Sequence, residues 1–124
     1  AAIEEAVTYY AALAAPAEPA VPSSDRAKRG QSIALGGVPE ADIPSCAHCH
    51  LPRGRRVNEA YPWLAGQYQE YLAQQLTLMQ QRARGGSEYV RLMHSFVDRL
   101  SVEQIDDAAA FFAGASGAAV PPVR

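Results

Sequence analysis

Apolar residues recur at helical spacing along most of the chain, and no stretch alternates with the period of two that a strand requires. The first pattern covers residues 3–14 and predicts an amphipathic helix with one apolar stripe, formed by Ile3, Ala6, Val7, Tyr10 and Leu13. Three prolines follow within residues 15–22, so we expect this helix to lead into an extended linker.

A second helix is predicted after Ser23 or Ser24, because either side chain suits an N-cap, and it should stop at Gly36-Gly37. Gly30 lies inside this helix, where glycine costs about 1 kcal/mol relative to alanine. We interpret Gly30 as a point where another helix crosses closely.

Two more helices are predicted in the second half of the chain. One covers residues 66–84, with an apolar face made of Tyr68, Leu72, Leu76 and Met79. The other opens with Ser101-Val102-Glu103-Gln104, which has the pattern of a capping box, and continues to Gly114. Between them we expect a short helix over residues 89–92 and then a loop that carries Met93.

These patterns predict an all-α fold with three regions. Residues 1–22 should form an N-terminal helix and a proline-rich linker, residues 23–115 one domain, and residues 116–124 a loose tail.

The strongest chemical signal is Cys46-Ala47-His48-Cys49-His50. Two cysteines separated by two residues and followed by histidine are typical of c-type haem attachment, in which each thiol forms a thioether and the histidine binds iron. A zinc site would need four ligands, and these are the only cysteines in the sequence. A redox disulfide would follow a strand, and no strand pattern precedes Cys46.

Composition supports a large cofactor. The chain has 124 residues and is 48% hydrophobic, but alanine supplies much of that share, and the aromatic residues are six Tyr, three Phe and one Trp. A core of such small side chains is thin for a domain of this size, and a buried haem would complete it.

Charge and hydropathy limit the possible partners. The net charge is −2, which gives no sign of nucleic-acid binding, although basic side chains are concentrated in residues 46–100. No run approaches the roughly 20 apolar residues of a membrane span, and no signal-peptide pattern is present. Because covalent haem attachment takes place outside the bacterial cytoplasm, we expect an exported, periplasmic protein from which a leader or an upstream segment has been removed.

The order of these features resembles class I cytochromes c, and most closely the cytochrome c4 and c553-type families. The resemblance covers about residues 24–114 and rests on Cys46–His50, Tyr61–Gln67, the segment from Tyr71-Leu72 to Arg84-Gly85, Met93 followed by Leu100-Ser101, and Phe111-Phe112. It implies a class I cytochrome c fold around one covalent haem c, with an extra N-terminal helix.

The same resemblance assigns the haem ligands. It makes Cys46 and Cys49 the thioether residues, His50 the proximal iron ligand and Met93 the distal ligand. Two departures stand out: the basic segment 51–56, and His94 directly beside Met93.

The distal ligand has three candidates. Met79 lies on the apolar stripe of a regular helix, where methionine is commonly core packing. His94 would be a stronger donor, but its plain interpretation is a surface or propionate-side residue. We expect Met93, because an irregular segment can curl over the ring.

Other residues have weaker signals. Tyr61 and Trp63 are expected to pack in the haem pocket, where the Tyr61 hydroxyl or the Trp63 indole N–H could donate to a propionate. Arg84 matches a basic position of the related families, which implies contact with a propionate. The basic side chains of residues 53–56 either face an acidic redox partner or form a solvated loop.

With both axial positions filled by the protein, the iron has no open site for dioxygen or peroxide. We therefore expect an electron carrier between a donor and an acceptor protein and not an enzyme. The alternative is a haem domain with an open distal site, acting as a peroxidase-like enzyme or a ligand sensor.

The two ends of the chain share a pattern. Residues 3–11 and 105–113 both have isoleucine, two acidic residues, small residues, an aromatic pair and alanine. We hypothesise that the first helix closes an upstream second haem domain, or pairs with a second molecule. The plain alternative is a single-haem protein with an extra amphipathic helix.

Overall fold

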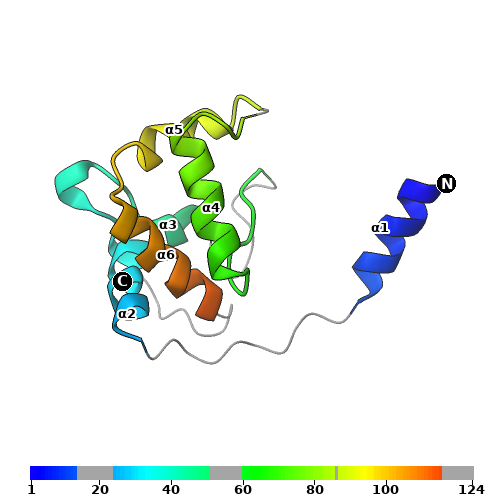
Figure 1. Cartoon of the computed structure of the whole chain (residues 1–124), viewed down its shortest axis with the longest axis horizontal. Helices are drawn as coiled ribbons and strands as arrows, with labels where there is room; N and C mark the ends of the chain where they lie inside the picture. The colour runs from blue at the N-terminus through cyan, green and yellow to red at the C-terminus, as the bar shows by residue number, and fades with distance from the viewer. Residues whose placement is uncertain (14–23, 51–59, 86, 116–124) are drawn as a thin grey trace.

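The computed structural model describes residues 1–13, 24–50, 60–85 and 87–115. Its elements, in chain order, are α1 (Ala2–Ala12), α2 (Asp25–Gly36), the short 3-10 helix η1 (Pro39–Ala41), α3 (Cys46–His50), α4 (Gln69–Gln80), α5 (Val90–Val97) and α6 (Val102–Gly114). Apart from these helices, the described residues form one isolated β-bridge, between Val38 and Ile43. The predicted all-α fold is confirmed (Figure 1).

The domain is built around the crossing of α2 and α6. Gly30 lies at this crossing, where a side-chain Cβ would overlap the backbone carbonyl of Asp107. Arg29, on the preceding position of α2, donates from Nε and Nη2 to the two carboxylate oxygens of Asp107, at 2.8 and 3.0 Å. The predicted close helix crossing at Gly30 is therefore confirmed, and an ion pair at its edge holds the two helices together.

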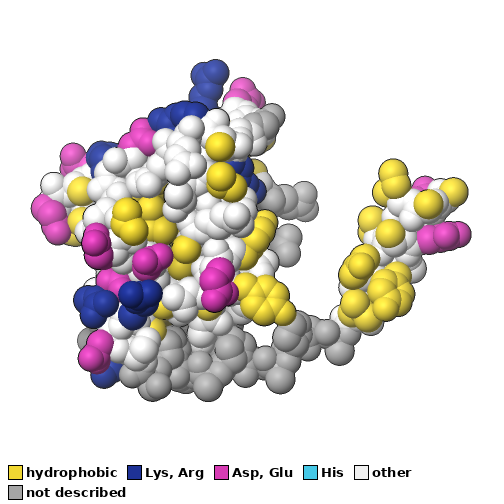
Figure 2. Space-filling model, in the orientation of Figure 1, with side chains coloured by type: hydrophobic (Ala, Val, Ile, Leu, Met, Phe, Trp, Pro, Cys, Tyr) yellow, Lys and Arg dark blue, Asp and Glu magenta, His cyan; other side chains and the backbone are white. Residues whose placement is uncertain are grey.

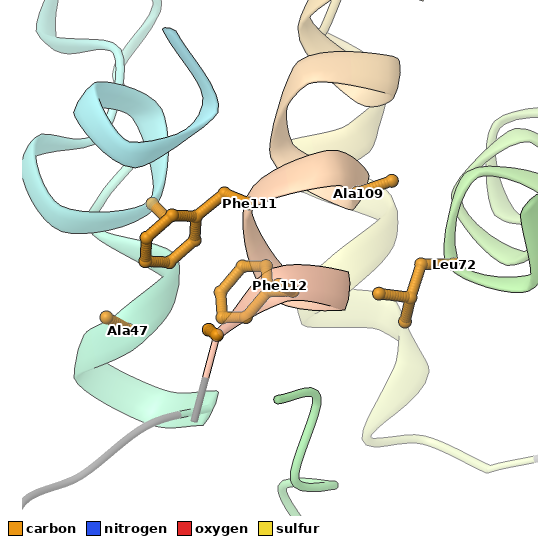
Figure 3. Packing of buried hydrophobic residues seen from close by; sticks show 7 residues of the cluster. Ala47, Leu72, Ala109, Phe111 and Phe112 are labelled. Carbon is orange, nitrogen blue, oxygen red and sulfur yellow. The ribbon is translucent and has the colours of Figure 1, made fainter. Parts of the chain in front are cut away.

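The core lies on both sides of α6. One cluster joins α6 to α3 and α4 through Ala47, Leu72, Ala109, Phe111 and Phe112 (Figure 3). The two phenylalanine rings meet edge to face, with centroids 5.3 Å apart. A second cluster joins α6 to α2 and the turn after it, through Ile33, Val38, Ile43 and Ala108. As composition predicted, alanine forms much of this core, so the helices pack closely.

Both helix starts with a predicted cap are confirmed. Ser24, rather than Ser23, caps α2, because its hydroxyl accepts a hydrogen bond from the Ala27 backbone N–H at 3.1 Å. Ser101 opens α6 with a full capping box: its hydroxyl accepts from the Gln104 N–H, and the Gln104 side-chain oxygen accepts from the Ser101 N–H.

Three predicted boundaries are wrong. The third helix begins at Gln69 and not at residue 66, because Gly66 has a positive φ of 79° and donates its N–H to the Phe112 carbonyl. It ends at Gln80 and not at residue 84, because Arg82 has a left-handed φ of 56°. The short helix predicted for residues 89–92 extends as α5 to Val97, so Met93 lies within a regular helix and not in a loop. Burial of Val97, which is fully enclosed, supplies the reason for the longer helix.

The N-terminal helix α1 buries none of its residues. Ile3, Val7 and Tyr10, which form its apolar stripe, are 80%, 63% and 70% exposed. Figure 1 shows α1 apart from the other helices, and Figure 2 shows its hydrophobic side chains at the surface. The predicted linker, the basic segment 51–56 and the predicted tail lie outside the described residues. Among the helices that are described, none is long and apolar enough to cross a membrane.

Candidate functional site

Helix α3 carries the CxxCH motif, and the chain before it fixes its position. The bridge between Val38 and Ile43 closes a tight turn after α2. Ser45 then donates its hydroxyl to the Ala34 carbonyl at 2.8 Å, which ties the start of α3 back to α2. Ala47, 2% exposed, faces the core, so the cysteines on either side of it are held at the edge of that core.

The two cysteines lie one helical turn apart on α3. Both are free thiols and half-buried. Residues three positions apart lie on the same side of a helix. Burial raises the pKa of the Cys46 thiol to about 11, so this sulfur stays protonated at neutral pH. Two thiols on one face, directly before a histidine, suit two thioether bonds to one planar ring.

His50 is the most constrained residue of the motif. Its side chain is buried, and its Nδ1 lies 2.8 Å from the carbonyl oxygen of Pro62. Because a carbonyl only accepts, this hydrogen bond places the proton on Nδ1 and leaves the Nε2 lone pair available for a metal. Burial lowers the pKa of His50, which favours the neutral ring that an iron ligand requires.

Tyr61 and Trp63 flank the residue that orients His50. The Tyr61 ring meets the His50 ring edge-on, with centroids 6.2 Å apart. Trp63 is 43% exposed, and Tyr71 on α4 is 46% exposed. Half-exposed aromatic side chains of this size are suited to pack against a flat apolar cofactor. That Tyr61 and Trp63 pack against a haem stays a prediction.

The three candidates for the distal ligand have different environments. Met79 is buried on α4, 7% exposed, as expected for core packing. His94 directs its Nε2 to the backbone carbonyl of Arg84 at 3.2 Å, so this ring nitrogen already has a partner. Met93 is half-buried on α5. Within the described residues its sulfur makes no hydrogen bond, unlike the His94 ring. Met93 lies in a helix and not in the expected loop.

Arg84 has an exposed side chain. Its backbone N–H donates to the Leu78 carbonyl, and its own carbonyl accepts from His94. The part of the chain that the structure describes contains no group of three or more His, Cys, Asp or Glu residues that could hold a metal ion. Cys46, Cys49 and His50 together offer two thiols and one oriented imidazole, which fit haem c. That Met93 is the distal ligand stays a prediction.

Sequence reasoning missed two contributors. The carbonyl of Pro62 orients His50, but a backbone oxygen carries no side-chain signal. Gln80, at the end of α4, donates from its amide to the carbonyls of Val97, the last residue of α5, and Leu100, three residues later. An isolated glutamine in a helical pattern does not reveal such a contact.

The chain matches no established protein-family profile. It is 34% identical to the thiosulfate dehydrogenase electron acceptor of Thiomonas intermedia (strain K12) over 107 residues, which are 86% of this chain and 49% of that protein. It is 33% identical to cytochrome c4 of Azotobacter vinelandii over 86 residues, 68% of this chain and 41% of that protein. The chain thus spans about half the length of the curated relatives it matches.

Solved structures agree with these relatives. The cytochrome c4 structure from Acidithiobacillus ferrooxidans superposes with a TM-score of 0.72 at 30% identity, covering 91% of this chain and 64% of that one. The thiosulfate dehydrogenase TsdBA from Marichromatium purpuratum superposes with a TM-score of 0.73 at 35% identity, covering 90% of this chain and 24% of that one. The chain therefore contains a class I c-type cytochrome domain and belongs with cytochrome c4 and the thiosulfate dehydrogenase electron acceptors.

Proposed function

We propose that this domain carries single electrons on one covalently bound haem c between a donor and an acceptor protein of the bacterial periplasm. The observation that supports this most is the hydrogen bond from His50 Nδ1 to the Pro62 carbonyl, directly after two thiols on one helical face. That arrangement prepares one axial ligand and two attachment points for the ring.

The mechanism assigns a separate task to each residue. Bound haem iron supplies one-electron oxidation and reduction. Cys46 and Cys49 would hold the ring by thioether bonds, and His50 would bind the iron through Nε2 while the Pro62 carbonyl keeps the imidazole plane fixed. Met93, on α5, would supply a thioether ligand that favours the ferrous state and raises the reduction potential relative to two histidine ligands.

The partners are proposed to be redox proteins met in short encounters. Relatives of this chain are named as electron acceptors of thiosulfate dehydrogenase and as cytochromes c4, which supports a donor of the dehydrogenase kind. In this proposal Tyr61, whose ring meets that of His50, and the half-exposed Trp63 would pack against the haem. The exposed Arg84 would interact with a propionate or an acidic partner.

Covalent attachment is tested by acid-acetone extraction of the coloured protein. The pigment should stay with the polypeptide, and its intact mass should exceed the chain by one haem. Colour in the organic layer would refute the proposal at its centre. Ferrous protein should also resist carbon monoxide, whereas ready binding would favour the open-site alternative of an enzyme or sensor.

A second proposal concerns α1, which we infer closes a further haem domain upstream in the natural polypeptide. Ile105, Ala109 and Phe112 of α6 are 2%, 1% and 3% exposed, because they pack on the rest of the domain. The matching positions of α1 are Ile3, Val7 and Tyr10, and all three are more than half exposed. An equivalent surface should therefore cover them.

The acidic positions of the two helices match as well. Glu5 corresponds to Asp107, which pairs with Arg29 beside the glycine of α2. The covering surface should therefore offer an arginine for Glu5 next to a small residue. The number of haems in the natural polypeptide tests the idea. Two haems per chain support it. One haem per chain, together with a solution mass twice that of one chain, supports pairing with a second molecule instead.

A further inference from the structure

Helix α5, which carries Met93, is held to the domain by the contact of His94 with the Arg84 carbonyl and by contacts at its C-terminal end. It has eight residues, and isolated helices shorter than about 12–15 residues are marginal in water. Val97 is its one buried residue, whereas Tyr89 and Leu92, at and near its start, are 66% and 47% exposed. The position of α5 therefore depends on what holds its C-terminal end.

Gln80, the last residue of α4, provides the first of these contacts. Its Nε2 donates to the Val97 carbonyl at 2.6 Å and to the Leu100 carbonyl at 2.9 Å. An amide nitrogen has two hydrogens, so both are used. The carbonyls at the end of a helix lack partners within that helix. One side chain of α4 thus caps the end of α5.

Arg82 provides the second contact, from an unusual backbone position. It has a φ of +56°, in the left-handed region that glycine commonly occupies after a helix. The N–H groups of Arg82 and Ala83 donate to the carbonyls of Met79 and Leu78, which is the Schellman pattern. A non-glycine residue is strained there.

The Arg82 side chain explains why glycine is not used at that position. Its Nη1 and Nη2 donate to the two carboxylate oxygens of Asp98, at 2.9 and 2.6 Å, and Nη1 also donates to the Met79 carbonyl. Asp98 is the residue that directly follows α5. A two-pronged pair fixes orientation as well as distance. The left-handed backbone of Arg82 therefore directs its guanidinium group to the carboxylate at the end of α5.

Met93 lies one turn before Val97, on the same side of α5. We propose that Gln80 and Arg82 are positioning residues for Met93: by clamping the end of α5 onto α4, they set where the Met93 thioether meets the haem iron. This inference rests on the proposed function, in which Met93 is the distal ligand. Neither residue touches the iron, so their effect is on the persistence of the iron–sulfur bond.

The test compares Gln80→Glu with Gln81→Glu in the haem-loaded full chain. Glutamate at position 80 loses both donated hydrogen bonds, while Gln81 is exposed and its side chain makes no hydrogen bond within the described part of the chain. Imidazole is added to the ferric protein, and displacement of methionine is followed by loss of the far-red sulfur-to-iron absorption band. Gln80→Glu should accelerate displacement by on the order of tenfold, with Gln81→Glu at the wild-type rate.

Two further variants separate positioning from general stability. Gln80→Leu repeats the loss of the donors without a new charge. Arg82→Gly removes the guanidinium group but relieves the left-handed backbone, so its two effects on the unfolding midpoint oppose each other, while displacement should still accelerate. Unfolding is measured by far-ultraviolet circular dichroism on the same samples.

The outcomes are distinct. Equal displacement rates in wild type, Gln80→Glu and Gln80→Leu would overturn the clamp. Faster displacement only in variants whose unfolding midpoint falls in proportion would also overturn it, because that is a stability effect. A wild-type protein without the far-red band, or a band that survives Met93→Ala, would instead refute Met93 as the ligand.

Discussion

Gly30 of α2 meets the backbone carbonyl of Asp107 in α6 so closely that no side chain fits between them. Gly36 belongs to the same helix, and no atom lies within 4 Å of the place a Cβ would take there. Two glycines of one helix thus have different roles: one is required by a helix crossing and the other is not.

The first prediction compares alanine at these two glycines. Gly30→Ala should destabilise the domain by about 3 kcal/mol or more, because overpacking commonly costs about 1–3 kcal/mol and here the obstacle is backbone. Gly36→Ala should be neutral or stabilising by about 0.5–1 kcal/mol, since it restricts the unfolded chain. Chemical denaturation of both variants measures the difference. Equal stability of the two would mean that α2 and α6 are farther apart than in this structure.

The second prediction concerns the start of α6. Ser101→Ala removes the hydroxyl that accepts from the Gln104 N–H, and it should cost about 1 kcal/mol. Gln104→Ala removes the other half of the box, and because the two bonds form one motif, the double variant should lose less than the sum of the single ones. Thermal unfolding of the three variants checks this. Full additivity would contradict the cooperative box.

The third prediction separates the two methionines. Met93→Ala should open the distal site, admit carbon monoxide and lower the reduction potential by on the order of 0.1 V, since the axial ligand tunes haem potential. Met79→Ala should keep the spectrum and lose roughly 2–5 kcal/mol of stability, because the side chain is buried. Redox titration and denaturation are measured on both. An exchange of the two outcomes would transfer the ligand role to Met79.

The fourth prediction uses the pair of Arg82 and Asp98. The hydrogen bonds from Arg82 hold the pKa of Asp98 below its usual 3.8, so the pair stabilises the fold above that value and the contribution is lost as the pH falls through the lowered pKa. Asp98→Asn should therefore be less stable than wild type at neutral pH, with a gap that closes in acid.

Denaturation midpoints across the acid range test this gap, with Glu88→Gln as an exposed control. Added salt should narrow the gap at neutral pH, because both partners are solvent-exposed and their attraction is screened. A gap that stays constant down to strongly acidic pH would mean that the asparagine acts through packing and not through charge.

Much of the molecule could be predicted from local pattern. The CxxCH motif, the capping box at Ser101 and the glycine inside α2 each depend on residues close together in the chain, and their chemistry allows few alternatives. The repeat between residues 3–11 and 105–113 is also visible in the sequence alone. Only the structure shows that the copy in α6 is buried while the copy in α1 is exposed.

The sequence by itself determined the helical fold, the capped starts of α2 and α6 and the attachment motif, because spacing and capping are local. Only the tertiary structure decided that Met93 lies in a helix, that Pro62 orients His50 and that Gln80 reaches α5. Burial of Val97 extends α5 beyond what its local pattern predicted. The other two contacts use backbone carbonyls, which every residue has, so which carbonyl meets which side chain depends on how distant segments pack.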